Sequence, residues 1–452
     1  MDIFKRLADR LIWLSEQPVF GVMAIALVAF ATRFWNLDGT ADVVFDEIYY
    51  PKFAQNYLRG ETLFDAHPPL AKYIIALGIQ IFGYAPLGYR FMTALAGSLL
   101  PLVTYEFVWQ LSDRRSWAWL TGWFVAMDGL LLVESRFGLI NIYILLFGML
   151  SQLCMLLALK RSRQRWFWAI ATGLMFGASV SVKWTGLAYV VGLVVIAGYA
   201  WSHYRQTLNV AQMVIGLVIV PITFYLVQWI PHLIINPERD IWKLHRQILG
   251  FHQNLGVGKT EPVHPYCSSW WSWVLLIRPV AYFYKNRPNG TVEFVHAMGN
   301  PFLYWLSAIA LLYLIFLITS KFRFYERVRA VFNNAGSSHH QELLPYKLSS
   351  LPKTTWLAIY VTTSFAAHWL PWSLSRRCIF LYHYMPASIF AFMALALVVS
   401  LMWRSTLDIV RAIGIGIFGI VAIAFLFWLP IYIGLPISSG YLPVLMWFRS
   451  WI

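Results

Sequence analysis

The sequence predicts an all-α polytopic membrane protein. Of its 452 residues, 59% are hydrophobic and only 12% are charged. Soluble domains usually carry about 25% charged residues, so this chain has too few ionisable groups to solvate its surface, and most of that surface must face lipid. Aromatic residues make up 17% of the chain and include 23 tryptophans. This abundance is typical of a protein with two membrane–water interfaces, where such rings settle.

Apolar runs predict about eleven transmembrane helices. A spanning helix needs about 20 mostly apolar residues. Such runs lie at about 18–35, 88–110, 115–132, 138–159, 166–182, 184–201, 209–231, 301–319, 354–373, 379–402 and 410–430. The segment 69–83 is shorter and charged near its start, so it predicts an interfacial or re-entrant helix.

Lysine and arginine are divided unequally between the connecting segments. With the N-terminus inside, the inner segments hold about eighteen of them and the short outer segments about five. Because cytoplasmic loops are enriched in these residues, the N-terminus is predicted to be cytoplasmic. The C-terminus is then periplasmic or extracytoplasmic, and the expected location is the inner (plasma) membrane.

The chain 1–452 is predicted to be one transmembrane domain with three longer loops. The outer segments 36–87 and 232–300 combine charge, aromatic rings, proline and histidine, so chemistry at the membrane surface is expected there. The inner segment 320–353 is polar and is predicted to be a cytoplasmic loop.

Charge and cysteine content limit the kinds of partner and ligand that the chain is expected to have. The net charge of +15 comes from short clusters between apolar runs rather than from one soluble face, so no nucleic acid is expected. Membrane lipids are the expected surroundings. The three cysteines, Cys154, Cys267 and Cys378, are an odd number without metal-ligand spacing. Neither a metal site nor a disulfide framework is predicted.

The first outer segment carries two adjacent carboxylates, Asp46 and Glu47, inside an aromatic run. On a solvated loop such a pair usually has no specific function. Beside a membrane span, where unpaired charge is costly, it is a candidate functional pair. Downstream, the motif HPPLAK places His67 where the loop re-enters the interface. His67 is either a helix cap or a group that contacts substrate.

Two basic residues lie at predicted outer helix ends. Arg136 either extends to lipid headgroups or binds a phosphate, whose oxygens match the guanidinium donors two at a time. Lys183 ends a helix of small residues, a costly position unless the ammonium meets an anion.

The later outer segments are rich in rings and cations. Aromatic residues near Trp270 form either an interfacial belt or a platform for a sugar or lipid. Cationic and phenolic groups near position 380 suit a lipid phosphate at headgroup depth. The candidates for phosphate binding are Arg136, Lys183, Arg376 and His383, and those for acceptor or sugar binding are His67, His264, Tyr266, Trp270 and Tyr382.

Several motifs occur in order on one predicted side of the membrane. They are FDE, HPPLAK, ESRF, ASVSVKWTG, HPYCSSWWSWVLLIRP, AMGNP and CIFLYHYMPA. Together they resemble the protein O-mannosyltransferases, a family of GT-C membrane glycosyltransferases, over nearly the whole chain. The resemblance implies a GT-C fold of about eleven helices, a polyprenyl- or dolichyl-phosphate mannose donor and Ser/Thr acceptors on secreted chains. It also implies that Asp46 and Glu47 are catalytic and that Arg136 is functionally important.

The sequence departs from the family pattern in two places. Asn141 stands where many members have an aspartate, which puts a role for that carboxylate in doubt. Only about 70 residues separate the seventh and eighth predicted spans, whereas eukaryotic members insert a large soluble module there. The chain is therefore more similar to bacterial members, whose acceptors are less uniform.

These residues suggest a mechanism. Asp46 is the expected general base for the acceptor hydroxyl, with inversion at the anomeric carbon. Glu47 would hold Arg136 or orient the acceptor backbone. Arg136 and Lys183, with Arg376 and His383, would stabilise the leaving phosphate. No cofactor is required, although a divalent metal is not excluded.

Two alternative functions remain open at this point. One is a GT-C transferase that modifies a lipid or glycan, such as an aminoarabinose or arabinose transferase. The other is a lipid or solute transporter. The outer placement of the charged residues disfavours transport, because transporters usually bind substrate near the midplane.

Overall fold

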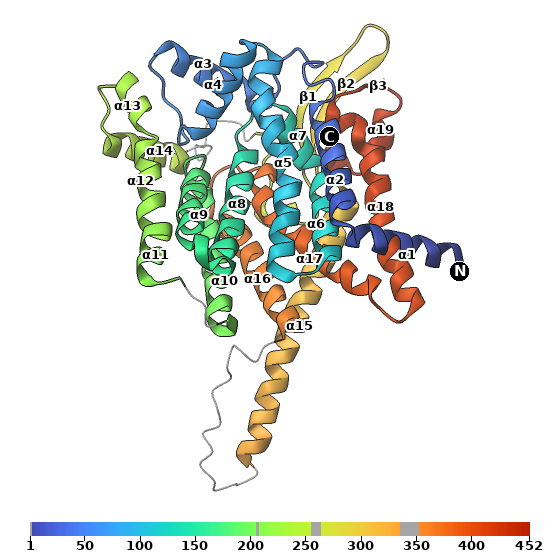
Figure 1. The fold of residues 1–452 in the computed structure, drawn as a ribbon. Helices are drawn as coiled ribbons and strands as arrows, with labels where there is room; N and C mark the ends of the chain where they lie inside the picture. The colour runs from blue at the N-terminus through green and yellow to red at the C-terminus, as the bar shows by residue number, and fades with distance from the viewer. Residues whose placement is uncertain (1, 205–207, 255–263, 335–351) are drawn as a thin grey trace.

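The computed structural model shows a bundle of helices with a layer of shorter elements at one end (Figure 1). It describes residues 2–204, 208–254, 264–334 and 352–452. The helices are α1 (Asp2–Glu16), α2 (Pro18–Phe34), α3 (Tyr50–Arg59), α4 (Leu70–Phe82), α5 (Pro86–Ser112), α6 (Arg115–Ala126), α7 (Gly129–Arg136), α8 (Asn141–Lys160), α9 (Arg165–Val180), α10 (Tyr189–Tyr204), α11 (Val210–Val214), α12 (Val220–Val227), α13 (Ile230–Ile235), α14 (Ile241–Asn254), α15 (Pro301–Asn334), α16 (Lys353–Trp369), α17 (Met385–Trp403), α18 (Asp408–Ile433) and α19 (Leu442–Leu445).

All eleven apolar runs coincide with helices. In the described part of the chain, seven helices are long and apolar enough to cross a membrane. Two more runs belong to bent pairs, α1–α2 with a 94° bend and α6–α7 with a 57° bend. The last two, α9 and α16, have 16 and 17 residues. The predicted helical, polytopic class is confirmed, and the number of spans stays a prediction.

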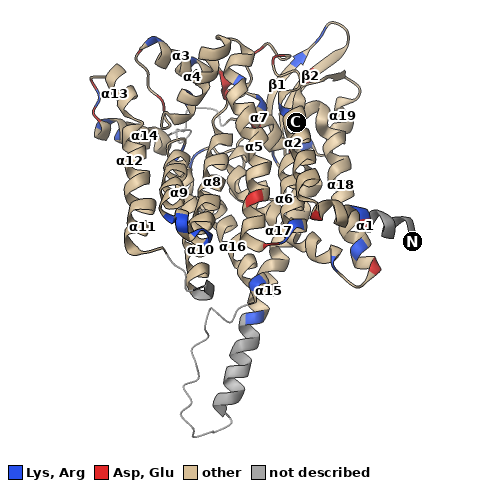
Figure 2. Ribbon diagram, viewed as in Figure 1, with Lys and Arg blue, Asp and Glu red and all other residues tan. Residues whose placement is uncertain are grey.

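The bundle is apolar both inside and on its flanks. Helices α8 and α17 are the most enclosed, since 78% and 83% of the residues in their most apolar stretches are buried. On the outer flanks, Val194, Ile309 and Ile423 are each more than 60% exposed. Apolar side chains this exposed mark a surface that faces lipid. Most charged residues lie toward the two ends of the helices (Figure 2).

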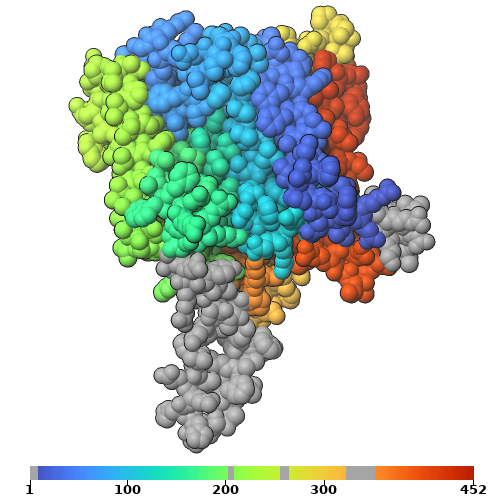
Figure 3. Space-filling model, in the orientation of Figure 1, coloured from blue at the N-terminus to red at the C-terminus, as the bar shows by residue number. Residues whose placement is uncertain are grey.

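One end of the bundle is covered by α3, α4, α13 and α14 (Figures 1 and 3). Helix α4 has 13 residues, too few to span a bilayer, and it occupies the segment predicted to be interfacial or re-entrant. At the opposite end, α15 continues to Asn334, so the first part of the predicted loop 320–353 is helical. Residues 335–351 lie outside the described residues.

A small antiparallel sheet, which the all-α prediction did not include, lies in the same end layer as α3 and α4 (Figure 1). Its strands are β1 (Val280–Asn286), β2 (Thr291–Ala297) and β3 (Pro436–Ser438), in the order β1-β2-β3. The turn between β1 and β2 contains Gly290 at φ 76°, a conformation that favours glycine. Strand β3 follows α18, so the last part of the chain pairs with the second outer segment.

Candidate active site

The two adjacent carboxylates of the first outer segment have different surroundings. Both lie on a short 3₁₀ helix, η1 (Phe45–Ile48). Glu47 is fully buried and paired with Arg90, whose Nε and Nη2 donate to its two oxygens at 2.8 and 2.7 Å. The backbone N–H groups of Val44 and Gly138 donate to the same carboxylate. Glu47 is therefore a structural anchor for this loop, held by a bidentate charge-assisted pair.

Asp46 is the free member of the pair. Its side chain is half-buried, and no described residue donates a hydrogen bond or forms an ion pair with its carboxylate. Burial raises the pKa of Asp46 to about 6, and the positive charge of Lys183 opposes that rise. Near neutral pH this carboxylate is ionised yet close to its titration range, as a general base should be.

Backbone strain fixes the position of Asp46. The preceding residue, Phe45, has a φ of 50°, which is uncommon for a bulky L residue and costs free energy. Its ring stacks on Tyr282 of β1 with centroids 4.3 Å apart and meets the edges of Phe380 and Tyr382. This packing holds the strained residue, so the sheet and the loop before α17 together orient the carboxylate.

Lys183 reaches the same region through a chain of hydrogen bonds. Its Nζ donates to Asn141 Oδ1 at 2.8 Å, and Asn141 Nδ2 donates to Glu134 Oε2 at 3.1 Å. The hydroxyl of Tyr282 donates to the other oxygen of Glu134. Among the described residues, Asn141 is the one acceptor of Lys183 Nζ, so two of its three donors remain for a ligand. Burial lowers the pKa of Lys183, opposed by Asp46 and Glu134.

A cavity of about 190 Å³ lies beside Lys183. Its polar lining consists mainly of basic and imidazole side chains, namely His67, Lys183, His252, Arg377 and His383. Arg377 Nη2 lies 3.4 Å from His383 Nε2, which orients the guanidinium. Such a lining suits a phosphate group.

This first cavity, called the cationic cavity below, adjoins a larger second one, called the apolar cavity. The second cavity has a volume of about 570 Å³ and shares Trp184, Thr185, Trp372 and His383 with the first. The rest of its lining is largely apolar and comes from the short 3₁₀ helix before α10, the end of α16 with the turn that follows it, and the start of α17. An amphipathic ligand with a phosphate head and a hydrocarbon tail fits this pair of cavities.

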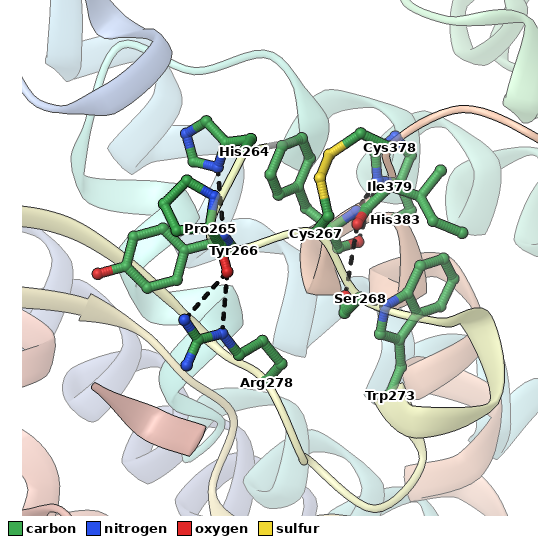
Figure 4. Close-up of a disulfide and its surroundings, with 11 residues drawn as sticks. His264, Pro265, Tyr266, Cys267, Ser268, Trp273, Arg278, Cys378, Ile379 and His383 are labelled. Carbon is green, nitrogen blue, oxygen red and sulfur yellow. Dashed lines mark hydrogen bonds between the residues drawn. A yellow bond between two sulfur atoms is a disulfide. The ribbon is translucent and has the colours of Figure 1, made fainter. Parts of the chain in front are cut away.

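A disulfide joins Cys267 to Cys378 across 111 residues (Figure 4). No disulfide framework was predicted from the sequence, and this single bond was not identified there, because the sequence separation hides the pairing. The bond is reinforced by Ser268 N, which donates to Ile379 O at 2.9 Å. It ties the second outer segment to the loop that carries Arg377.

Some predicted site residues lie away from the cavities. Arg136 donates to the backbone carbonyls of Thr32, Arg33, Trp35 and Asn36 and so caps the end of α2. Its predicted pairing with Glu47 is wrong, since Arg90 holds that carboxylate. Arg376 is exposed and lines neither cavity; the neighbouring Arg377 does.

The residues predicted to bind acceptor or sugar are placed unevenly. His67 lines the cationic cavity, and the ring of Tyr382 lies 5.5 Å from Lys183 Nζ. His264 is exposed and packs against Phe380. Two others have protein partners: Tyr266 contacts Arg278, and Trp270 packs against Trp369.

Two family models match consecutive halves of the chain. The model described as dolichyl-phosphate-mannose-protein mannosyltransferase matches residues 23–235, and that of the C-terminal four TMM region of protein-O-mannosyltransferase matches residues 237–451. The chain belongs to the protein O-mannosyltransferase family. It is 25% identical, over 94% of its length and 92% of the relative, to the polyprenol-phosphate-mannose–protein mannosyltransferase of Corynebacterium glutamicum.

Solved structures share the fold. The S. cerevisiae protein O-mannosyltransferase Pmt1-Pmt2 complex, bound to the sugar donor, matches with a TM-score of 0.77 and 15% identity, over 98% of this chain and 94% of that one. ArnT from Cupriavidus metallidurans, bound to undecaprenyl phosphate, matches with a TM-score of 0.57 and 14% identity, over 92% and 77%. This protein O-mannosyltransferase family member is thus a multi-pass membrane glycosyltransferase of the GT-C type.

Three residues that the structure places at the candidate site of this family member were not among the site residues predicted from its sequence. Arg90 lies at the start of a predicted span, where an arginine in an apolar run is itself a signal. Arg377 was indistinguishable from Arg376. His252 had no sequence signal, because it lies on an amphipathic helix of mixed composition. In the described part of the chain, no cluster of three or more His, Cys, Asp or Glu side chains is placed to hold a metal ion.

Proposed function

We propose that this enzyme transfers mannose from polyprenyl-phosphate mannose to Ser/Thr hydroxyls of secreted or membrane proteins. The observation that carries the proposal is the free carboxylate of Asp46 near a cationic cavity that adjoins an apolar one. The names of the relatives supply the sugar and the class of acceptor.

The donor would bind across both cavities. Its phosphate would lie against Lys183 and Arg377, and its hydrocarbon chain would extend into the apolar cavity lined by Trp184, Trp372 and Leu374. This orientation directs the phosphate-linked sugar toward Asp46, whose charge interacts with that of Lys183.

The chemistry then requires one base and one anion site. The acceptor hydroxyl gives its proton to Asp46 and attacks the anomeric carbon from the face opposite the phosphate. The anomeric C–O bond breaks, its electron pair passes to the phosphate oxygen, and the configuration inverts. Lys183 and Arg377 stabilise the second negative charge that forms on the phosphate. Glu47 serves this step by fixing the loop rather than by moving a proton.

The active site would face the extracytoplasmic side of the inner membrane. The positive-inside distribution of lysine and arginine supports this orientation, with the N-terminus in the cytoplasm. The cavities lie among the segments that the sequence assigns to the outer face. Polyprenyl-phosphate mannose and a Ser/Thr-containing polypeptide are the proposed partners.

Transfer of radiolabelled mannose from polyprenyl-phosphate mannose, in membranes containing wild type or Asp46→Asn, tests the proposal. Label on Ser/Thr of protein with wild type and none with the variant supports it. The matched control is Asp42→Asn, since Asp42 pairs with Lys285 at the exposed surface and should retain full transfer. Label that appears only in lipid or glycan would instead assign the acceptor to that class.

A further inference from the structure

His252 reaches the cationic cavity from α14, which also contributes Leu249 to its lining. Helix α14 packs Leu244 and Ile248 onto Trp229, which fixes its orientation. In its last turn, His252 Nε2 lies 2.8 Å from the carbonyl oxygen of Ala66. The imidazole lines the cavity together with His67, Lys183 and Arg377.

This contact determines which nitrogen carries the proton. A carbonyl oxygen only accepts hydrogen bonds, so Nε2 must be the protonated nitrogen of the neutral ring. Nδ1 is then an acceptor, and it is buried without a hydrogen-bond partner among the described residues. Such an acceptor beside a phosphate is unfavourable unless it gains a proton and becomes a donor.

A second imidazole lies alongside. The ring of His67 is 5.1 Å from that of His252, centroid to centroid, and makes no side-chain hydrogen bond to a described residue. Burial, with a contribution from Arg377, lowers the pKa of His252 to about 4. Burial and the charge of Lys183 lower the pKa of His67 well below its ordinary value. Without a ligand, both rings are neutral at physiological pH.

The reaction changes the charge in this cavity, if the proposed function holds. The donor's phosphate is a diester with one negative charge. Once the anomeric C–O bond has broken, the carrier holds a phosphate monoester that can bear two. The titratable groups that line the cavity are the positively charged Lys183 and Arg377 and the neutral imidazoles of His67, His252 and His383. The added negative charge therefore favours protonation of a neighbouring imidazole.

We propose that His252, with His67 beside it, takes up a proton from water when the lipid phosphate gains its second negative charge. Protonated Nδ1–H then donates to a phosphate oxygen while Nε2–H stays on Ala66. This proton is distinct from the one that Asp46 removes from the acceptor. The dianionic form of the spent carrier is thus bound more tightly at low pH, and its release is coupled to loss of that proton.

The linkage between proton binding and lipid binding gives the expected size of the pH effect on affinity. A histidine whose pKa rises from about 4 in the free enzyme to an ordinary value of about 6.5 in the complex strengthens binding about tenfold between pH 8 and pH 5.5. The phosphate's own titration contributes equally to variants that bind the same lipid, so the comparison between variants isolates the histidine.

The test is equilibrium binding of radiolabelled undecaprenyl phosphate to purified, detergent-solubilised protein at pH 8 and pH 5.5, measured as the lipid retained with the protein. All proteins carry Asp46→Asn, which removes the titration of that carboxylate. His252→Gln keeps a donor for Ala66 but cannot gain a proton, and His67→Gln is the second variant. The control is His245→Gln, seven residues earlier on α14, whose imidazole is held by Tyr225 and Ile241.

We expect the ratio of affinities at pH 5.5 and pH 8 to be about tenfold larger in the parent and in His245→Gln than in His252→Gln. Equal ratios in all of them, including His67→Gln, would overturn the proton uptake and leave the lipid-phosphate site standing. Loss of the pH effect in His67→Gln alone would overturn the assignment to His252. No binding by the parent at either pH would contradict both this inference and the proposed donor.

Discussion

Arg90 donates two parallel hydrogen bonds of 2.8 and 2.7 Å to Glu47, and both side chains are fully buried. The same guanidinium donates to the carbonyls of Leu37, Thr40 and Asp42. One side chain of α5 thereby fixes the loop on which Asp46 sits. The pair therefore positions Asp46, and the proposed mechanism assigns Glu47 no proton transfer.

Removing one partner of this pair should destabilise the protein strongly. Glu47→Ala leaves the buried charge of Arg90 unpaired, a loss of about 3–5 kcal/mol, and it should also reduce mannose transfer. The measurement is thermal unfolding of the detergent-solubilised protein. Glu61→Ala, which breaks the exposed pair with Arg59, should cost no more than about 1 kcal/mol. Equal losses in the two variants would contradict the anchoring role.

Transfer should depend on the ionisation of Asp46. A base works only as the carboxylate, and burial raises its pKa to about 6, so kcat/KM should fall about tenfold per pH unit below about 6. Lys183→Met removes the positive charge that opposes this rise, so the acidic limb should move to higher pH. Lys285→Met, which changes an exposed pair, should leave the limb in place. A profile that is flat down to pH 5 would exclude Asp46 as the base.

Loss of the Lys183 ammonium should also slow transfer at optimal pH. Stabilising groups aimed at developing charge typically contribute about 10²–10³-fold, so Lys183→Met should reduce kcat by about that factor. The readout is single-turnover mannose transfer at saturating donor. If only the KM for the donor rises, Lys183 binds the donor and the transition state equally.

The hydrogen bond from Lys183 to Asn141 predicts the effect of restoring an acidic residue there. Asn141→Asp would put a second carboxylate between Lys183 and Glu134. The positive charge of Lys183 would then be offset by an ion pair within the protein. We expect weaker binding of polyprenyl-phosphate mannose, by about tenfold, in a direct binding assay. Asn289→Asp, in the exposed turn between β1 and β2, is the control. Unchanged affinity would show that Lys183 does not face the phosphate.

The disulfide should be needed for full activity. Cys378→Ser frees the loop that carries Arg377 and removes a cross-link whose loop, at about 100 residues, contributes up to about 4.7 kcal/mol in the chain-entropy model. Lower transfer and lower thermal stability are expected, and dithiothreitol should reproduce both in wild type. Cys154→Ser changes the free buried cysteine and should respond to dithiothreitol as wild type does. Full activity of Cys378→Ser would limit the bond to a stabilising role.

The helical bundle was predictable because length and hydropathy are local properties. Each of the eleven apolar runs coincides with a helix, including the 16-residue α9. The sheet was not predictable, because β3 comes from beyond α18 to pair with β2, and no local pattern records that partnership. The motif-bearing segments were found for the same reason as the helices, since each motif is continuous in sequence.

Individual roles within the site depended on geometry that sequence does not carry. Asp46 and Glu47 are neighbours, yet only the structure separates a free carboxylate from one held by Arg90. Arg376 and Arg377 differ only in the side of the loop from which they project. Arg136 donates hydrogen bonds to carbonyl groups at the end of α2. It lies beside those carbonyls because of the bend between α6 and α7, which the sequence does not show.

The pairing of β3 with β2 imposes an order on biogenesis. Tyr282 of β1 donates its hydroxyl to Glu134 and supports the ring of Phe45, while the sheet to which it belongs gains its third strand only from the segment after α18. A nascent chain therefore cannot complete this sheet until α18 and the segment after it have been synthesised. The sheet is thus completed late in synthesis, after the rest of the bundle has been made.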